Sequence, residues 1–517
     1  MKSPDKHLPR PLARAVQLLA AAALAGCAAG PDFHAPPPPQ ATGYLRGEPK
    51  DAAAPPSEAA APQPRWWAAY GSERLNALVE RALQRNPGIA AGEASLRQAQ
   101  QNVNAQQGLF YPSAQLGYSA ARQNSGTVLS SPLSSGQSLY NLHTAQLTVG
   151  FVPDVFGGNR RQVESLQAAA DSQRYQTDAL RMTLASNVAA AVLQEQSLLD
   201  QLQIVTEALS LAKEQLQHTR AQQAAGYGSG MDLAQQEAAL AQAQALLPPL
   251  NKQLEQTRDL LAVLCGDLPS ELAAPDEGPS TGHLARLRMP QPLPQVVPSQ
   301  LVQYRPDVQA AQAQLHAAYA QIGVSVSNML PQFSIGANLA YSAATLPNLI
   351  SPARQSWGLV AGLTQPLFAG GALTARKRAA EAAAEAAQAQ YQGAVLTAFQ
   401  NVADTLYALE HDGRALEAAE RNVAASERLM ALTDQQFSQG YAARPAWLAA
   451  RQALLQEQRQ IIHTLVTEFG ERPDRLEPMF AEDFASAPDD NARLRVVVDQ
   501  VASLTDHRAR ALAEQLP

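Results

Sequence analysis

Two different kinds of segment follow one another in this chain, and only the second alternates strictly between apolar and polar positions. The residues between Pro306 and Pro331 are rich in alanine and glutamine. From Phe333 to Tyr341, apolar residues then alternate with small or polar ones. A proline is tolerated in the first turn of a helix, whereas strict alternation places apolar side chains on one face of a strand. The pattern therefore predicts a helix followed by a strand.

The same order occurs earlier in the chain. Pro87 and Pro112 precede Pro306 and Pro331 by one and the same offset, and an alternating segment follows at 114–121. A further alternating segment follows in each copy, at 145–151 in the first and at 357–363 in the second. A repeat of such long period indicates an internal duplication, here with two strands in each copy.

Long helices are predicted after the strands. Residues 159–225 contain neither glycine nor proline, and their apolar positions step by three and four, with Glu195 as the one polar break. In the second copy, apolar residues recur every seven positions from Val395 to Phe437. A helix through 159–225 would be about 100 Å long at about 1.5 Å per residue. Heptad spacing makes such helices supercoil around their neighbours.

Gly-Tyr pairs at 226–227 and 440–441 interrupt these helical patterns and predict two reversals of chain direction. The helix that returns from the first reversal is expected to bend at Pro248-Pro249, because proline cannot donate to the helical ladder.

The N-terminus has the pattern of a secretory signal. Basic residues precede an apolar run at 15–25, which ends in the letters LAGC at Cys27. This end resembles a bacterial lipobox, which implies cleavage before Cys27 and a diacylglyceryl thioether on its sulfur. Ala28 follows, and by the same resemblance favours sorting to the outer membrane. The alternative is an ordinary signal with an incidental cysteine.

Composition divides the chain into six predicted parts. They are a lipoprotein signal peptide (1–26), a lipidated Pro-rich linker (27–64), a first structural repeat (65–265), an inter-repeat strap (266–299), a second structural repeat (300–470) and a C-terminal extension (471–517). Proline-rich segments such as the linker and the strap form extended connections without a core of their own. The extension is predicted to be partly disordered.

Charge and motif content exclude several functions. The 517 residues carry a formal net charge of −7, which argues against nucleic acid as a partner. No HExxH, GxSxG, P-loop or CxxC motif occurs, so an enzyme and a metal site are not expected. His316 is interpreted as a surface residue. No apolar run of about 18 residues follows the signal region, so any membrane crossing must use strands.

Several segments together carry a family resemblance. PSQLVQYRPDVQAAQAQLHAAYAQIGV…LPQFSIGANLAYSA, followed by LTQPLFAGGAL, resembles the second half of TolC/NodT-type outer-membrane efflux lipoproteins, and the resemblance extends from about Trp66 to Phe469. It implies a mainly α chain with a small transmembrane β part. Four strands cannot close a barrel alone, and arithmetic leaves the number of copies open. The resemblance selects a homotrimer with a 12-stranded β-barrel, continuous with a periplasmic α-helical barrel.

The resemblance also implies the function and the partners. The expected role is a passive exit duct in the bacterial outer membrane that passes drugs or other small toxic compounds outward. A periplasmic adaptor and an inner-membrane efflux transporter would supply the compounds and the energy. Outer-membrane lipid is expected to surround the strands, and no cofactor is expected besides the covalent lipid on Cys27.

A gate is expected at the two helix reversals, the far end of such a duct. The residues there that can offer hydrogen bonds or ion pairs are Gln222, Tyr227, Asp232, Tyr441 and Arg444. The alternative is that these are solvated tip residues. Several relatives carry acidic residues after the second reversal. This chain has Trp447 and Arg451 there, so an acidic ring is not expected.

A periplasmic coiled-coil lipoprotein stalk or adaptor without a pore is the competing hypothesis. It explains the long helices, but it does not explain the alternating strands, the lipobox or the duplication. The two hypotheses differ in whether the protein conducts ions across a membrane.

Overall fold

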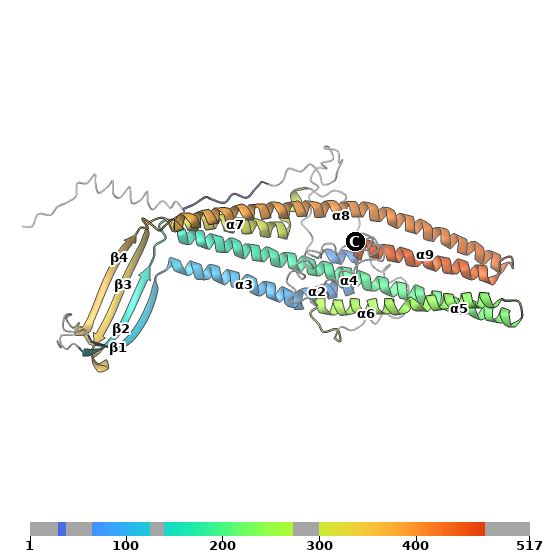
Figure 1. Ribbon diagram of the computed structural model, residues 1–517, viewed down its shortest axis with the longest axis horizontal. Coiled ribbons are helices and arrows are strands. Elements are labelled where there is room, and N and C mark those ends of the chain that lie inside the picture. Colours follow the sequence, from blue (N-terminus) through green and yellow to red (C-terminus); the bar gives the residue numbers. More distant parts are fainter. Residues whose placement is uncertain (1–28, 38–64, 125–138, 272–298, 471–517) are drawn as a thin grey trace, which may run out of the picture. The chain divides into compact units, whose positions relative to one another are not determined.

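The computed structural model describes residues 29–37, 65–124, 139–271 and 299–470 (Figure 1). The predicted signal peptide, Cys27, most of the linker, most of the strap and the extension lie outside these residues. The described part of the chain is mainly helical with one four-stranded sheet, which confirms the predicted fold class. None of its helices combines the length and the apolar character needed to cross a membrane.

Each repeat contains short helices, two strands, a long helix and, after the chain reverses, the helix or helices that run back along it. The first repeat comprises η1 (Trp66–Tyr70), α2 (Glu73–Arg85), α3 (Pro87–Gln107), η2 (Gly108–Phe110), β1 (Ser113–Asn124), β2 (Leu139–Phe151), α4 (Gly158–Ala224), α5 (Gly230–Ala245) and α6 (Leu247–Leu264). The second comprises η4 (Ser299–Tyr304), α7 (Pro306–Ser327), β3 (Gln332–Ala343), η5 (Leu346–Asn348), η6 (Pro352–Arg354), β4 (Gln355–Thr364), α8 (Ala372–Ser438) and α9 (Arg444–Gly470). As expected, Pro87 and Pro306 each open a helix.

The duplication is visible in the bounds of the elements. β3 begins and ends at the same offset from β1 that separates Pro306 from Pro87. α4 and α8 are both 67 residues long, but their offset along the chain is slightly smaller. This difference arises between the end of the first strand and the start of the long helix, where the second repeat is shorter. The long helices are therefore equal in length although the connections before them are not.

Local boundaries differ from the predictions in the strands and in one helix. The first two strands, predicted at 114–121 and 145–151, reach Asn124 and begin at Leu139, respectively, because these ends pair with each other. The bend expected at Pro248-Pro249 is an interruption at Leu246, which separates α5 from α6 while its backbone stays in the right-handed helical region. Proline lacks the N–H that would bond to the preceding turn, so the ladder stops and a new helix starts with proline in its first turn.

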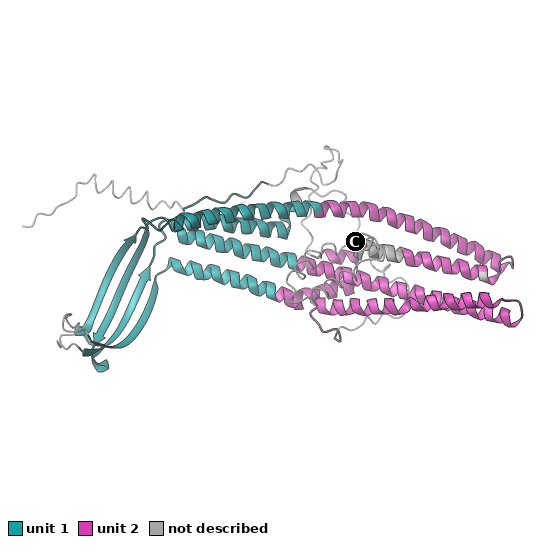
Figure 2. Cartoon of the chain, in the orientation of Figure 1, with its two compact units in different colours: residues 1–50, 91–180, 298–400 teal, residues 51–90, 181–297, 401–517 magenta. Residues whose placement is uncertain are grey.

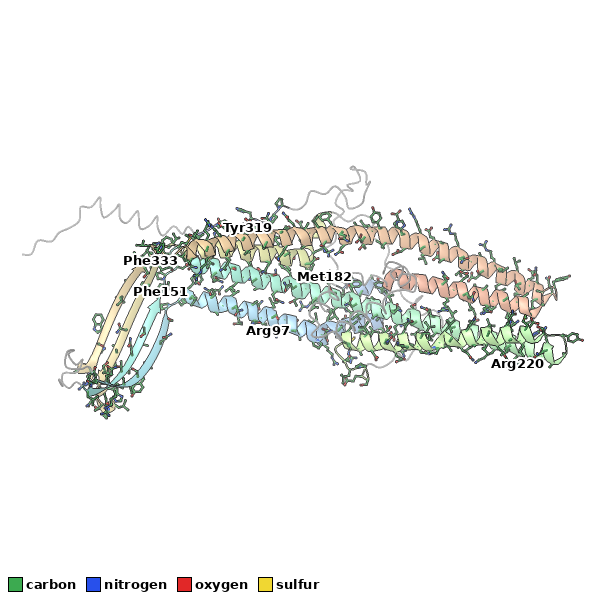
Figure 3. All side chains as sticks on the ribbon, in the orientation of Figure 1. Arg97, Phe151, Met182, Arg220, Tyr319 and Phe333 are labelled. Atoms are coloured by element: carbon green, nitrogen blue, oxygen red, sulfur yellow. The ribbon has the colours of Figure 1, made fainter. Side chains whose placement is uncertain are left out.

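The sheet has the order β1-β2-β3-β4 with every neighbouring pair antiparallel. Its central pair, β2 with β3, joins the two repeats. Phe151 ends β2 and Phe333 lies at the start of β3, where these strands meet the helices (Figure 3). β1 and β4 each pair on one side only, so both edges of the described sheet are open.

The chain forms two compact units that do not coincide with the repeats (Figure 2). One unit comprises 1–50, 91–180 and 298–400, and contains the sheet. The other comprises 51–90, 181–297 and 401–517, and contains both helix reversals. Each unit takes segments from both repeats because α4 and α8 pass from one unit into the other.

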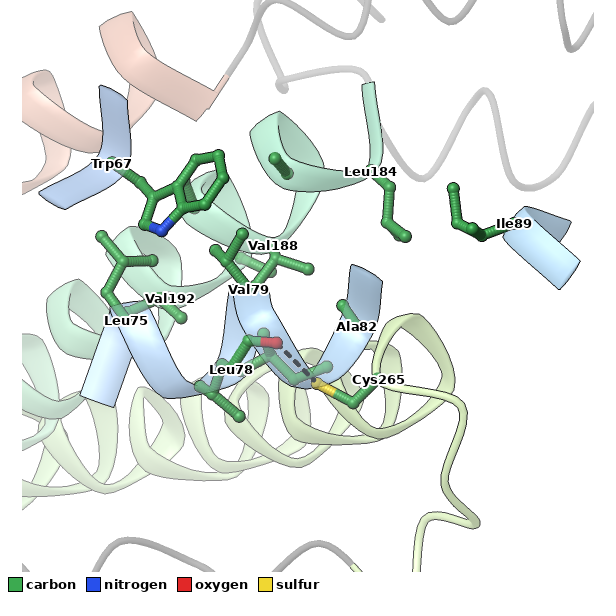
Figure 4. Packing of buried hydrophobic residues seen from close by; sticks show 14 residues of the cluster. Trp67, Leu75, Leu78, Val79, Ala82, Ile89, Leu184, Val188, Val192 and Cys265 are labelled. Atoms are coloured by element: carbon green, nitrogen blue, oxygen red, sulfur yellow. Dashed lines mark hydrogen bonds between the residues drawn. The ribbon is translucent and has the colours of Figure 1, made fainter. Parts of the chain in front are cut away.

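An apolar cluster in the second unit joins η1, α2, α4 and α6 (Figure 4). Val79 and Val188 are fully buried in it, and Trp67 packs beside them. Cys265 closes the cluster, and its thiol donates to the Leu78 carbonyl oxygen at 3.6 Å. Burial, together with the charge of Asp267, raises the pKa of the Cys265 thiol. The side chain therefore serves as a small apolar group in the protonated form.

Glu195, the polar break in the α4 pattern, is a buried ion-pair centre. Its side chain is fully buried, with Arg258 Nε 3.2 Å from Oε1 and Arg74 Nη2 2.6 Å from Oε2. The contact with Arg258 is a directed hydrogen bond, whereas that with Arg74 is an ion pair without hydrogen-bond geometry. The carboxylate thus connects α4 to α2 and α6. A buried charge is tolerated in a helix seam only when it is paired in this way.

We expect Glu195→Ala to destabilise the second unit, because Arg74 and Arg258 would lose the carboxylate that they share and Arg258 would keep only the exposed Glu255. Removing one partner of a buried pair costs about 3–5 kcal/mol. The midpoint of thermal unfolding, followed by the helical circular dichroism signal, should fall by roughly 6–10 °C. Glu410→Ala, which removes an exposed pair with Arg414 on α8, is the control and should shift it little. Equal midpoints for the two variants would contradict the assigned role of Glu195.

Candidate functional site

The first helix reversal is a glycine-terminated helix end. Gly226 has a φ of 82°, and its N–H donates to the Gln223 carbonyl oxygen at 2.9 Å. The N–H of Tyr227 donates to the Gln222 carbonyl oxygen, also at 2.9 Å. This pair of bonds defines a Schellman motif, which needs a left-handed residue after the helix. The Tyr227 side chain is 90% exposed.

The second reversal has the same backbone geometry. Gly440 has a φ of 80° and donates to the Phe437 carbonyl oxygen at 3.0 Å, while the N–H of Tyr441 donates to that of Gln436 at 2.8 Å. The Tyr441 side chain is 84% exposed. The two Gly-Tyr pairs therefore terminate α4 and α8 in the same way and leave both tyrosine rings in solvent.

Asp232 has a local structural role at the first reversal. Its carboxylate accepts from the Ser229 N–H at 3.1 Å, and its own N–H donates to the Ser229 hydroxyl at 3.1 Å. This capping box fixes the start of α5. Arg220 of α4 pairs with Glu237 of α5 at 2.9 Å, so the first hairpin is also held by an exposed ion pair.

Arg444, at the start of α9, forms an ion pair with Glu214 of α4. Its guanidinium carbon lies 5.8 Å from the ring centroids of both Phe437 and Trp447, within the range of cation–π contacts. The Trp447 indole N–H donates to Asp434 at 2.8 Å, which orients this ring between α8 and α9. Arg444 therefore joins the second hairpin to the first.

A second pair of the same kind lies one heptad further along the helices. Arg451 Nε donates to Glu207 at 3.1 Å, and the Arg451 Nη2 contacts the same carboxylate. Glu207 and Glu214 are one heptad apart on α4, and Arg444 and Arg451 are one heptad apart on α9. Because α4 and α9 run antiparallel, the two acids face the two bases in order. We call these four residues the Glu–Arg ladder.

The five residues predicted as gate candidates thus have different surroundings. Arg444 alone among them takes part in an ion pair between the hairpins. Asp232 caps α5, Gln222 contributes its carbonyl oxygen to the first reversal, and the two tyrosines are exposed. The sequence interpretation missed Glu207 and Glu214. Oppositely charged residues at matching heptad spacings were the signal that could have identified them.

The sheet has one apolar and one uncharged polar face, as its register shows. The apolar face carries Ala114, Leu116, Tyr118, Ala145, Leu147, Val149, Phe151, Phe333, Ile335, Ala337, Leu339, Tyr341, Trp357, Leu359, Ala361 and Leu363. Large side chains on this face are exposed in the single chain: Leu116 is 81% exposed and Trp357 is 77% exposed. Unpartnered apolar surface of this size is typical of a membrane or protein interface.

The opposite face consists mainly of glycine, serine, threonine and amide side chains. The amide of Asn338 lies over Gly358, where a Cβ atom would come 2.7 Å from the Asn338 Oδ1. Ser334 covers Gly362 in the same manner. Arg122 is the one lysine, arginine, aspartate or glutamate in the four strands, and by register it lies on the face of Tyr118. The polar face of these strands therefore carries no formal charge.

Comparison with known proteins gives a consistent result. A family model described as Outer membrane efflux protein matches residues 78–267 and 297–465. A second model, described as Phosphohydrolase-associated domain, matches residues 449–515, most of which lie outside the described part.

Relatives and solved structures agree with the first model. The pyoverdine export outer membrane protein OpmQ of Pseudomonas putida is 31% identical over 407 residues, covering 78% of this chain and 84% of its own. The toluene efflux pump outer membrane protein TtgF of the same species is 26% identical over 460 residues, covering 85% and 91%. The outer-membrane channel OprN shares the fold with a TM-score of 0.73 at 25% identity, covering 86% of this chain and 96% of its own.

The resemblance seen in the sequence is thereby confirmed over most of both repeats. The long helices, the paired strands and the two reversals all fall within the matched residues. The chain therefore belongs to the outer membrane efflux protein family.

Proposed function

We propose that three copies of this chain form a passive exit duct through the outer membrane. The observation that carries the proposal is the four-stranded sheet with an exposed apolar face and an uncharged polar face. A strand in a membrane barrel has this alternation because one face meets lipid and the other meets the water-filled interior. A soluble coiled-coil stalk would not explain a sheet that exposes an apolar face on one side and an uncharged polar face on the other.

The apolar face has the height of a membrane. On β3, apolar residues occupy every second position from Phe333 to Tyr341. Eight residue steps of about 3.4 Å give roughly 27 Å along the strand. A tilt of about 40° reduces this to roughly 21 Å, close to the band of about 25 Å found in outer-membrane barrels. Tyr118, Tyr341 and Trp357 lie near one end of the band, where aromatic side chains suit a lipid–water interface.

Closure of the sheet requires further copies. β1 and β4 would leave backbone groups unpaired in hydrocarbon, at a cost of several kcal/mol for each group. Pairing β4 of one copy with β1 of the next satisfies both edges. Three copies then supply twelve strands, the number that the family resemblance implies.

The lining of the strands does not select cargo by charge, because the polar face is uncharged. The relatives named above are labelled for pyoverdine export and for toluene efflux, which are chemically dissimilar compounds. We therefore assign cargo selection to an inner-membrane pump, and delivery to a periplasmic adaptor. The duct itself is passive, and a lipid on Cys27 adds a second attachment to the membrane.

The Glu–Arg ladder is the proposed clamp of the periplasmic gate. It joins α4 of the first hairpin to α9 of the second, so separation of the hairpins must break it. All four side chains are partly exposed, between 38% and 43%. Pairs of this exposure contribute about 0.5 kcal/mol each, which lets an opening signal overcome them.

The two faces of β4 should respond oppositely to charge. We expect Leu359→Lys, on the apolar face, to reduce trimer yield in detergent, because lysine facing lipid costs about 2–4 kcal/mol at mid-membrane. Ser356→Lys, on the polar face of the same strand, is the matched variant and should still assemble. Light scattering of the purified proteins gives the copy number.

Planar-bilayer recordings test the duct itself. The wild-type protein should conduct ions, and Ser356→Lys should shift its selectivity toward anions. A wild-type protein that is soluble without detergent, monomeric and non-conducting would favour the coiled-coil stalk instead.

Breaking the ladder should favour the open state. We expect Arg444→Ala with Arg451→Ala to raise the open-to-closed ratio roughly fivefold for each of the three chains, the effect of losing about 1 kcal/mol per chain. Single-channel recording at low salt measures this ratio.

Charge exchange provides the specific control for the gate. Adding Glu207→Arg and Glu214→Arg to Arg444→Glu and Arg451→Glu restores both pairs with reversed polarity, and should restore the closed state. Arg414→Ala removes an exposed pair within α8 and should change nothing. An unchanged open-to-closed ratio in the double alanine variant would reject the ladder as the clamp.

A further inference from the structure

The described N-terminal segment, residues 29–37, is attached to the first unit by backbone hydrogen bonds. The Ala29 N–H donates to the Phe156 carbonyl oxygen at 3.0 Å, just before α4. In return, Arg161 Nε donates to the Ala29 carbonyl oxygen at 3.1 Å. The backbone N–H and C=O groups of Ala29 are therefore both hydrogen-bonded, which holds the segment beside the start of α4.

Two glycines allow the segment to approach α7 closely. A Cβ atom on Gly30 would lie 2.4 Å from the Gly323 Cα, and Gly30 has a φ of 91°, which other residues rarely adopt. A Cβ atom on Gly323 would lie 2.6 Å from the Ala29 carbonyl oxygen and 2.8 Å from the Arg161 Cγ. Neither position can hold a side chain while the segment stays in place.

Arg161 is the charged centre of this contact. Its side chain is 6% exposed and forms ion pairs with Asp32 at 2.5 Å and with Glu164 at 2.8 Å. Hydrogen bonding and the charge of Arg161 lower the pKa of Asp32. Burial alone would raise the pKa of Glu164, but hydrogen bonds from Arg161 and His316 lower it overall. Both carboxylates are therefore ionised at neutral pH.

Phe33 completes the contact by stacking on His316. The ring centroids are 4.4 Å apart with an interplanar angle of 13°, and Tyr319 meets Phe33 edge-on at 5.8 Å. His316 Nε2 lies 2.8 Å from Glu164 Oε1, which orients the imidazole (Figure 3 shows Tyr319 on α7). His316, interpreted from the sequence as a surface residue, keeps 35% of its side chain exposed, while Phe33 from a distant part of the sequence stacks on its ring.

We propose that the surface between α4 and α7 is a docking site for the chain's own Ala29–Phe33 segment, and that this latch holds the N-terminal segment at the base of the sheet. Four features recognise four parts of the segment. They are a backbone exchange at Ala29, a glycine contact at Gly30, a guanidinium at Asp32 and an aromatic stack at Phe33. α4 belongs to the first repeat and α7 to the second, so the latch also bridges the two repeats.

The position of the latch gives it a function. Phe156, the acceptor for Ala29, packs against Phe333 of β3, with 6.4 Å between the ring centroids. The latch therefore holds the segment beside the base of the strands, where the apolar face begins. That this end of the sheet faces the membrane rests on the proposed function, whereas docking of the segment does not.

Spin labelling of the full chain tests the latch directly. A nitroxide on Ala35→Cys, an exposed position in the segment, should give an immobilised spectrum in the otherwise wild-type protein. Gly323→Ala should convert it to a mobile spectrum, because the added methyl group occupies the place of Ala29. Alanine is favoured over glycine in a helix, so α7 itself is not weakened.

Matched variants separate release of the segment from general damage. Gly393→Ala, also in a helix of this unit, adds its methyl group in open space and should leave the label immobilised. Phe33→Ala removes the aromatic stack from the segment side and should mobilise the label. An immobilised label in both Gly323→Ala and Phe33→Ala would overturn the latch.

The parent chain without Ala35→Cys distinguishes the latch from the proposed lipid. Cys265 is buried, and a lipidated Cys27 has no free thiol, so this protein should not take up label. Labelling at Cys27 would contradict the lipid while the Gly323→Ala comparison still decides the latch.

The latch should withstand mild acid. Carboxylates with a lowered pKa contribute stability that is present above their ordinary pKa of about 4 and is lost as the pH falls through the lower folded value. His34 and His316 also face these carboxylates, and a proton on either adds an attractive charge. The label should therefore stay immobilised from pH 7.5 to about 5 and become mobile only below about pH 4. Release of the segment between pH 6 and 7 would contradict the role of the Arg161 ion pairs.

Discussion

Pairing of backbone groups across the sheet is the constraint on which the rest of the structure depends. Within one chain, β2 and β3 satisfy each other and thereby fasten the two repeats together. β1 and β4 have no such partner in the described chain, and an apolar face beside them is exposed. A sheet of this kind is stable in hydrocarbon only when its edges are paired. The duplication supplies equivalent edges, so identical copies can continue the sheet.

Contacts between the two repeats differ in strength in the two compact units. In the first unit, the repeats share the hydrogen bonds between β2 and β3. They also share two hydrogen bonds between α4 and α7, in which the hydroxyl groups of Ser165 and Ser172 donate to backbone carbonyl oxygens of α7 at 3.0 Å. In the second unit, near the reversals, they share the partly exposed Glu–Arg ladder. Exposed ion pairs contribute little and are screened by salt, whereas sheet hydrogen bonds exclude water. These described contacts between the repeats are therefore weaker near the reversals, where the proposed gate lies.

Paired charges hold segments that have little apolar surface of their own. Glu195 connects α4 to two other helices, and Arg161 holds a short N-terminal segment whose one large apolar side chain is Phe33. In both places, one buried charged group has partners on separate elements. Such groups define a single arrangement, because any displacement leaves a charge without its counter-ion in a poorly solvated site.

The sequence by itself determined the elements, because periodicity and proline position act locally. Pro87 and Pro306 marked the helix starts, strict alternation marked the strands, and the equal offset of the two proline pairs revealed the duplication. Tertiary structure alone decided which charges meet. Glu207 and Glu214 became partners of Arg451 and Arg444 only when α4 and α9 were placed antiparallel. His316 and Arg161 acquired their roles from a segment far away in the chain. Local sequence records the preference of each residue for a backbone shape, whereas pairing depends on which distant surfaces come into contact on folding.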